Sequence, residues 1–231
     1  MKNDRIKDEL TYLAFARGAD FVGVAELASA AQFITEQYGA EMAKFPRAVV
    51  AAVVFPKEVV NELKDAPTHT YLNYYKALNV RLDDIALSIC TFLQRKGFRA
   101  FPIPASQRVS ESRLSSIFSH RLAGNLAGMG WIGKSCNFIH PEVGPRLRLV
   151  TVLTDCLLPT SGKQMQEKCG DCMLCTEACP AGAIKGVNFY PGQPLAERFD
   201  ASACDVYLSK VRVTFGKRIC GRCMAVCPHG Y

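Results

Sequence analysis

The sequence predicts a mixed α/β (α+β) sheet domain with packed helices, followed by a smaller cysteine-rich module. Helical and strand-like hydrophobic patterns alternate through the first two thirds of the 231 residues. Apolar residues make up 49% of the chain and charged residues 21%, which is too hydrophobic for disorder and indicates a packed core. Eight of the eleven cysteines lie in residues 160–231, so we expect a domain boundary at residue 159.

The first domain, 1–159, alternates helices and strands. Asn3 or Asp4 can cap a first helix, whose apolar residues recur at helical spacing until a stop at Arg17 and Gly18. A continuous valine-rich run at 48–55 is typical of a central strand covered on both faces. The remaining predicted elements are strands at 19–27 and 98–103, helices at 29–38, 68–96 and 112–129, and a hairpin that pairs 137–140 with 146–154.

The module at 160–231 contains two runs of cysteines at ligand spacing. The first run is Cys169-x2-Cys172-x2-Cys175-x3-Cys179-Pro180, which matches the bacterial ferredoxin pattern at every position. The second run, Cys220-x2-Cys223-x3-Cys227-Pro228, repeats the last three positions of that pattern and lacks the first. Cys204 is the remaining cysteine of the module and can fill this position.

The spacing of these runs predicts two [4Fe-4S] clusters with crossed ligands. In two-cluster ferredoxins the fourth cysteine of a run binds the other cluster. The first cluster is assigned to Cys169, Cys172, Cys175 and Cys227, and the second to Cys179, Cys204, Cys220 and Cys223. Two neighbouring clusters of this kind transfer electrons and are no catalyst by themselves.

Zinc and disulfides are the alternatives for these cysteines. Zinc favours isolated sites built from two separated pairs, whereas these runs interlock. An odd number of cysteines cannot all pair, and the polar N-terminus has no signal-peptide core, so we expect a cytoplasmic location. No apolar run reaches the roughly 18 residues of a membrane span, so we expect no membrane partner.

The formal charge of +7 can be explained by the predicted clusters, whose negative charge partly balances it. Each predicted cluster site carries a net charge of about −2, so two loaded sites lower the formal charge by about four. Lysine and arginine form no run longer than a pair. We therefore expect a mixed solvated surface, and a nucleic-acid partner is not favoured.

The segment Gly128-Met129-Gly130-Trp131-Ile132-Gly133 has the GxGxxG spacing of a dinucleotide site. That motif requires a strand before it and a helix after it, so that the pyrophosphate meets a helix N-terminus. Here a predicted helix comes first, and Gly130 is placed to end it. A nucleotide site is therefore not favoured, and two alternatives stay open: helix-to-sheet packing, or a surface for a flat cofactor.

Several stretches together resemble a known family. Residues 119–134, SHRLAGNLAGMGWIGK, are followed by PEVGPR at 141–146, by VLTD at 152–155 and by the double cysteine run. This combination is similar to the epoxyqueuosine reductases and, more distantly, to the reductive dehalogenases, with the closest match over 98–231. The resemblance implies a nitroreductase-like domain that binds base-off cobalamin, joined to a two-cluster ferredoxin module that passes electrons to the cobalt.

The resemblance also implies site residues. The implied cofactor-binding residues are Ser119, His120, Gly128, Gly130, Trp131, Gly133 and Lys134. The catalytic residue is open: His120 is the candidate, and a satisfied polar residue near a helix surface is the alternative. The acidic loop of the family has no counterpart, since residues 103–108 hold no carboxylate and the next is Glu111. The chain ends at Tyr231, where those enzymes continue into a region that helps hold tRNA.

Four further residues lie outside these assignments. Cys90, Cys136 and Cys156 do not fit the ferredoxin pattern, and we expect none of them to bind metal. Cys90 falls in the apolar stripe of its predicted helix and is expected to be buried and inert. His229 follows the last cluster cysteine by two residues and is placed to tune that cluster through a hydrogen bond.

Two functions fit these observations. The first is an iron–sulfur reductase that passes electrons through two [4Fe-4S] clusters to a bound corrinoid for a low-potential reduction. The alternative is a non-catalytic ferredoxin-type electron-transfer protein, or a reductive activator of a partner's cofactor. The expected partners are a low-potential donor such as ferredoxin or flavodoxin, and a small-molecule substrate or a corrinoid protein.

Overall fold

The structure is a computed structural model and describes residues 2–107, 114 and 116–230. The chain divides into two compact units, each built from three separate stretches. The first comprises Met1–Val53, Leu78–Met129 and Arg148–Met165, and the second comprises Val54–Ala77, Gly130–Leu147 and Gln166–Tyr231. This division differs from a boundary at residue 159, because two stretches of the expected first domain pack with the cysteine module. That 1–159 and 160–231 are separate functional domains stays a prediction.

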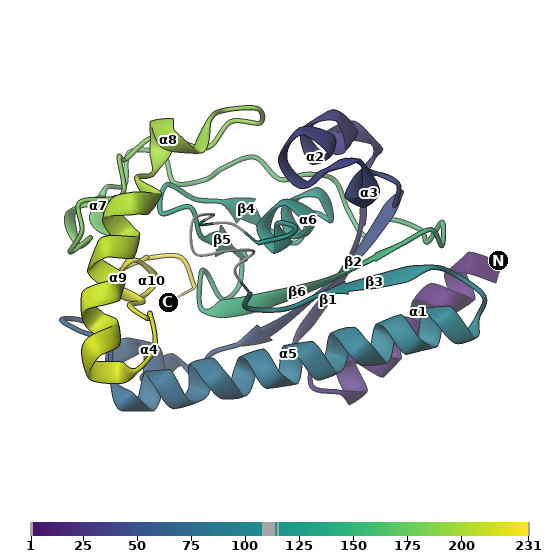
Figure 1. The fold of residues 1–231 in the computed structure, drawn as a ribbon, viewed down its shortest axis with the longest axis horizontal. Helices are drawn as coiled ribbons and strands as arrows, with labels where there is room; N and C mark the ends of the chain where they lie inside the picture. The colour runs from purple at the N-terminus through teal and green to yellow at the C-terminus, as the bar shows by residue number, and fades with distance from the viewer. Residues whose placement is uncertain (1, 108–113, 115, 231) are drawn as a thin grey trace. The chain divides into compact units, whose positions relative to one another are not determined.

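The first unit contains a four-stranded sheet in the order β1–β2–β6–β3 (Figure 1). Its strands are β1 (Phe21–Glu26), β2 (Arg47–Val54), β3 (Ala100–Ile103) and β6 (Leu147–Thr154). β1 is antiparallel to β2, with Phe21 opposite Ala52, and β3 is antiparallel to β6, with Ala100 opposite Thr154. Six consecutive residues of β2 are buried, so its valine-rich run forms a strand covered on both faces, as predicted.

Helices cover both faces of this sheet. α1 (Lys2–Ala16) and α5 (His69–Arg95) lie along one face, and α6 (His120–Leu126) lies on the other (Figure 1). The unit also contains η1 (Ala28–Ala30), α2 (Ala31–Tyr38) and α3 (Ala40–Ala43). Leu10 of α1 and Leu82 and Ile85 of α5 are fully buried in its core. Among the residues that the structure describes, no helix is both long and apolar enough to cross a membrane.

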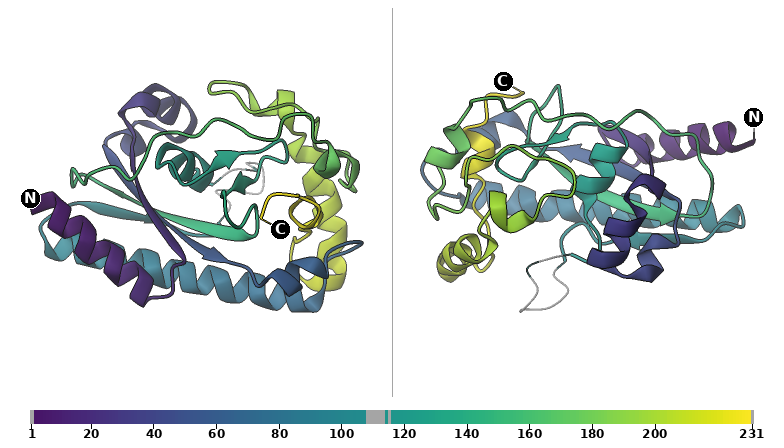
Figure 2. Two further views of the ribbon diagram at one scale, coloured as in Figure 1. Left: turned by 180° about the vertical axis from the view of Figure 1, so that it is seen from behind. Right: turned by 90° about the horizontal axis from the view of Figure 1, so that it is seen from above.

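The second unit consists mainly of short elements joined by loops. They are α4 (Lys57–Asn61), β4 (Trp131–Ile132), β5 (Phe138–Ile139), α7 (Leu174–Glu177), α8 (Leu195–Arg198), α9 (Ala201–Phe215) and α10 (Arg222–Ala225). Figure 2 shows α9 as a long helix among short ones. Asp200 caps it by accepting a hydrogen bond from the Ala203 amide at 2.9 Å, and Gly216 ends it in a left-handed conformation. α7 and α10 pack against each other, which brings the two cysteine runs together.

The predicted hairpin of 137–140 with 146–154 is wrong. β5 pairs instead with β4, with Trp131 opposite Ile139, and β6 lies between β2 and β3 in the larger sheet. The two-residue strand β4 lies inside the glycine-rich segment. So short a strand shows no alternating pattern in the sequence, and the hairpin partner was therefore misassigned.

The helix predicted at 112–129 is shorter in the structure. α6 begins after Ser119, whose hydroxyl accepts a hydrogen bond from the Leu122 amide at 3.2 Å. Serine at this position satisfies an amide that the first helical turn leaves unpaired, and it therefore defines the start. Arg108, Glu111 and the expected beginning of the helix at residues 112 and 113 lie outside the described residues.

Candidate metal centre

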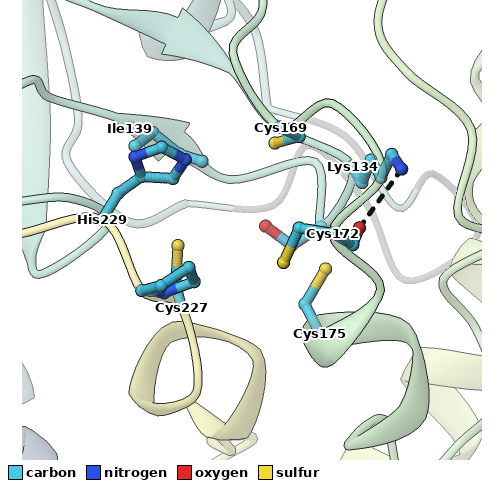
Figure 3. Close-up of a pocket in the computed structure, with 9 residues that line it drawn as sticks. Lys134, Ile139, Cys169, Cys172, Cys175, Cys227 and His229 are labelled. Atoms are coloured by element: carbon cyan, nitrogen blue, oxygen red, sulfur yellow. Dashed lines mark hydrogen bonds between the residues drawn. The ribbon is translucent and has the colours of Figure 1, made fainter.

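Four cysteines of the second unit line one hollow of about 320 Å³ that is partly open to solvent (Figure 3). They are Cys169, Cys172, Cys175 and Cys227, the set predicted for the first cluster. Figure 3 shows their sulfur atoms around a shared space, with the ring of His229 to one side. Cys169 and Cys172 come from the loop before α7, Cys175 from α7 and Cys227 from the turn after α10. The structure thus brings together residues from both cysteine runs.

The loop that carries the first run is held by its own backbone. The Cys172 amide donates to the Cys169 carbonyl at 3.1 Å, and the Cys169 amide donates to the Glu167 carboxylate at 2.9 Å. Gly133 lies so close to its surroundings that a Cβ at that position would overlap the Ile139 side chain and lie 3.2 Å from Cys169 Sγ. Glycine at 133 therefore leaves space around a sulfur that is assigned to the metal.

The second predicted set is Cys179, Cys204, Cys220 and Cys223, all half-buried. Hydrogen bonds from both the backbone and a side chain reach sulfurs of this set. Cys179 Sγ accepts from the Ala183 amide at 3.3 Å, and Cys223 Sγ accepts from Asn137 Nδ2 at 3.4 Å. Hydrogen bonds to the sulfurs of a cluster are one of the features that set its potential.

Cys204 lies in the first turn of α9. Burial, followed by the neighbouring Cys220 and Cys179 thiols, raises the pKa of Tyr207, so this tyrosine lies near both cysteines. Tyr207 comes three residues after Cys204, and residues three apart share a face of a helix. The geometry of α9 therefore favours Cys204 as the fourth member of the set, and its ligation stays a prediction.

Two of the thiols assigned to the clusters, those of Cys223 and Cys227, hold their protons at neutral pH. Burial raises the pKa of the Cys223 thiol to about 12 and that of the Cys227 thiol to about 11, and neighbouring thiols add to both shifts. A metal or cluster must displace these protons to bind. Within the described part of the chain, no three His, Cys, Asp or Glu side chains are placed to hold one single metal ion.

Lys134 is a buried cation at this centre. It is only 5% exposed and lines the same hollow as the four cysteines. Its ammonium donates to the Cys172 carbonyl at 3.2 Å (Figure 3) and lies 3.8 Å from Met173 Sδ. Among the described residues no carboxylate pairs with it. Buried charges in proteins are almost always paired, so the structure calls for an anionic group in this place.

The residues present fit a [4Fe-4S] cluster. Four thiolates around such a core carry a net charge of about −2 in the oxidised state, which supplies the counter-charge that Lys134 lacks. When bound, a cluster of this kind supplies one-electron transfer. The four thiols, the glycine at 133 and a buried ammonium with no carboxylate partner among the described residues are the observations that support this occupant.

His120, the candidate catalytic residue, lies in the first unit with both ring nitrogens engaged. Nε2 lies 3.1 Å from the Pro104 carbonyl and Nδ1 lies 2.9 Å from Thr151 Oγ1. Because a carbonyl only accepts, Nε2 carries the proton and Nδ1 accepts from the threonine hydroxyl. Burial, aided by the positive charges of Arg148 and Arg121, lowers the pKa of His120 to about 4. This geometry favours the satisfied polar alternative, and the catalytic role stays a prediction.

Ser119 and Gly128 of the predicted pocket also lie in the first unit. Ser119 caps α6, and Gly128 follows the end of α6 with a φ of 73°. A Cβ at Gly128 would lie 2.8 Å from the Lys163 carbonyl oxygen. Both residues therefore have a structural role, and their contact with a cofactor stays a prediction.

Gly130 and Trp131 lie in the second unit with Gly133 and Lys134. Gly130 packs against the backbone of Ile139, with no space for a side chain. Trp131 is 2% exposed, and its ring meets the His229 ring edge-on at 4.9 Å between centroids. Its buried Nε1 has no hydrogen-bond partner among the described residues.

Sequence reasoning missed two residues of this unit, Asn137 and Arg198. Asn137 contacts the second cysteine set through Cys223. Arg198, 5% exposed, donates from Nη1 to Cys136 Sγ at 3.2 Å, so this cysteine, expected to bind no metal, has an arginine beside it. The available signal for Asn137 was its polar side chain next to two apolar residues at 138–139. That signal does not reveal a contact with Cys223, which lies far away in the chain.

Comparison with known protein families identifies the cysteine module. Residues 168–230 match the family described as 4Fe-4S double cluster binding domain. This match supports two [4Fe-4S] clusters in the segment for which the cysteine spacing predicts them. It covers all eight cysteines of the two predicted sets.

The chain is also similar to curated reductases. It is 31% identical to the epoxyqueuosine reductase of Salmonella typhimurium over 184 residues, which are 72% of this chain and 42% of that protein. It is 32% identical to the epoxyqueuosine reductase of Bacillus cereus over 120 residues, which are 48% of this chain and 29% of that protein. The chain spans less than half the length of the curated relatives it matches.

Solved structures show the same fold. A catabolic reductive dehalogenase superposes with a TM-score of 0.76 at 23% identity, covering 99% of this chain and 32% of that one. An epoxyqueuosine reductase solved with an epoxyqueuosine-modified tRNA stem loop superposes with a TM-score of 0.61 at 23% identity, covering 98% of this chain and 65% of that one. The predicted resemblance is therefore confirmed: the chain has the fold of these two reductase groups, carries a 4Fe-4S double cluster binding segment, and is similar in sequence to the epoxyqueuosine reductases.

Proposed function

We propose that this chain is an iron–sulfur reductase. It takes electrons one at a time from a low-potential donor of the ferredoxin or flavodoxin type. It passes them through two [4Fe-4S] clusters to a bound corrinoid, which reduces a substrate. The observation that carries the proposal is the ring of four cysteines with the buried Lys134 beside it, with which no carboxylate of the described residues pairs. The odd number of cysteines and their ligand spacing also favour a reducing compartment, the cytoplasm.

Trp131 supports the corrinoid. Its indole donor is buried with no acceptor among the described residues, and it lies in the segment that the resemblance assigns to the corrinoid pocket. A corrinoid carries amide side chains whose carbonyl oxygens accept such a hydrogen bond, so the residue fits this cofactor. When bound and reduced, a corrinoid supplies a strongly reducing cobalt centre. The contribution of this chain is to hold the cofactor, exclude water and deliver electrons.

The loop after β3 bears on the choice of substrate. Residues Pro104 and Ala105 are held from three elements: His120 Nε2 donates to the Pro104 carbonyl, Asp83 Oδ1 accepts from the Ala105 amide at 2.8 Å, and Arg148 donates to the Ala105 carbonyl at 3.3 Å. The acid that the resemblance places in this loop is absent from 103–107. We therefore propose a small-molecule substrate. Epoxyqueuosine in tRNA, the substrate named for the relatives, is the competing outcome of the test.

The missing loop carboxylate favours a second candidate function. In this alternative the chain transfers electrons or reductively activates the corrinoid of a partner protein, without turning over a substrate itself. The two cysteine sets serve this function as well as they serve catalysis. The two candidates differ in whether the chain itself binds a corrinoid and completes a reaction.

Anaerobic purification followed by an absorbance titration with cobalamin separates the two. The reductase proposal expects stoichiometric binding, and turnover of a reducible small molecule when ferredoxin or flavodoxin supplies electrons. An epoxyqueuosine-modified stem loop is tested in parallel. Tight binding with no turnover of either substrate favours the activator. No binding to the iron-loaded chain rejects the corrinoid reductase.

A further inference from the structure

One short turn of the second unit reaches both cysteine sets. This turn, Gly133–Asn137, joins β4 to β5. At its beginning Lys134 donates to the Cys172 carbonyl at 3.2 Å, and at its end Asn137 donates to Cys223 Sγ at 3.4 Å. Cys172 belongs to the first set and Cys223 to the second. The Gly133 amide donates to the Asn137 carbonyl at 3.0 Å, which closes the turn, so both side chains extend from one hydrogen-bonded element.

We propose that this turn sets the reduction potentials of the two clusters separately, Lys134 raising that of the first and Asn137 that of the second. The inference deepens the proposed function, because it rests on the two clusters of that proposal. It moves Lys134 from the corrinoid pocket, where the resemblance placed it, to the loop of the first cluster. Both are positioning residues, since each acts on the metal through a ligand loop or a ligand sulfur.

The charge of Lys134 is the reason to expect a raised reduction potential at the first cluster. Reduction by one electron from an external donor changes the net charge of a four-thiolate cluster site from about −2 to about −3. A fixed positive charge stabilises the more negative state more strongly, and burial weakens the screening of that attraction by water and salt. Lys134 as a residue is 5% exposed, and no carboxylate within the described residues neutralises its ammonium. Its field therefore acts on the first cluster with little compensation.

The amide of Asn137 is the reason to expect a raised reduction potential at the second cluster. An N–H donor to a ligand sulfur stabilises the electron-rich reduced state, and such hydrogen bonds are among the features that set cluster potentials. Cys223 accepts this bond from a side chain, which a substitution can remove without breaking the backbone. Because the amide is neutral, we expect a smaller effect than that of the lysine charge.

The test is a potentiometric titration of the iron-loaded chain, followed by electron paramagnetic resonance. Lys134→Gln keeps a hydrogen-bond donor and removes the charge. We expect at least a tenfold fall in the reduced-to-oxidised ratio of one cluster at a fixed potential, which is about 59 mV for one electron. Asn137→Leu is expected to lower that ratio about threefold for the other cluster, or about 28 mV. Each variant leaves the potential of the remaining cluster unchanged.

Lys168→Gln is the matched control for charge. Lys168 precedes Cys169, but it is exposed, and its ammonium lies 5.8 Å from the centre of the Trp131 ring. Removal of the Lys168 charge is expected to change the reduced-to-oxidised ratio of either cluster at a fixed potential by no more than about threefold. A Lys168 effect equal to that of Lys134 overturns the claim that burial gives Lys134 its influence.

Three results contradict the proposal. One is a Lys134→Gln variant with full iron content and unchanged potentials. Another is a shift of the same cluster by Lys134→Gln and Asn137→Leu. If Lys134→Gln does not retain iron, Lys134→Arg carries the test: it keeps the charge, and a shift beyond about threefold in the ratio refutes the charge argument. Failure of the wild-type chain to show two reducible clusters refutes the proposed function instead, so the two failures are distinguishable.

Discussion

His120 is expected to make folding stability depend on pH, and His120→Gln to remove that dependence. Its pKa is about 4 in the folded chain, against an ordinary value of 6.5. As the pH falls below 6.5 the unfolded chain takes up a proton that the folded chain takes up only near pH 4. The contribution of neutral His120 to the free energy of unfolding is therefore complete above pH 6.5 and is lost progressively between pH 6.5 and pH 4. Glutamine can donate to Pro104 and accept from Thr151 without titrating, which makes it a matched variant.

The size of the effect follows from the two pKa values. Between pH 7.5 and 5.5 they give a loss of about 1.3 kcal/mol in the free energy of unfolding, which the partial exposure of the residue reduces to about 1 kcal/mol. The assay is anaerobic urea unfolding followed by far-ultraviolet circular dichroism at both pH values. Other groups titrate in both proteins, so the difference between wild type and variant isolates His120. Equal pH dependence in the two proteins refutes the buried neutral imidazole.

Four substitutions in the second unit give further tests. Cys227→Ser and Cys179→Ser are each expected to lower the iron content of the chain from about eight atoms to about four, and a variant that keeps eight contradicts the assignment of that ligand. Gly133→Ala places a methyl group 3.2 Å from Cys169 Sγ, and is expected to cost about 1–3 kcal/mol in urea unfolding and to reduce iron retention; wild-type stability with full iron opposes this. Trp131→Phe removes an unpaired buried donor, and is expected to change stability by less than about 1 kcal/mol while weakening cobalamin binding at least fivefold; unaltered affinity shows that Nε1 does not serve the corrinoid.

Those parts of the fold that depend on local pattern follow from the sequence. The valine-rich run at 48–55 becomes the buried strand β2, and the long apolar stripe from Thr68 becomes α5. Pairing between distant segments does not follow in the same way. β5 joins β4 because two residues at 131–132 are extended, and no periodic signal marks so short a strand. That each unit is built from three separate stretches of the chain cannot be predicted either, since it depends on contacts between residues far apart in the sequence.

The site, like the fold, has features that local sequence predicts and features that only tertiary packing decides. The spacing of the cysteine runs is enough to group Cys169, Cys172, Cys175 and Cys227, because covalent geometry limits which thiols one cluster can reach. Lys134 could be chosen as functional from its place after a glycine, but its partner could not. Whether a side chain faces a corrinoid or a cysteine loop is decided by tertiary packing, which here directs it to the Cys172 carbonyl. Asn137 shows the same limit, since its partner sulfur lies in the other cysteine run.

Iron and acid-labile sulfide measured together in anaerobically purified protein test the central claim most directly. We expect about eight iron atoms and about eight sulfides per chain, from two clusters that use all eight cysteines of residues 160–231. About two zinc ions per chain with almost no sulfide would contradict the account, because the electron-transfer function would then lose its carriers.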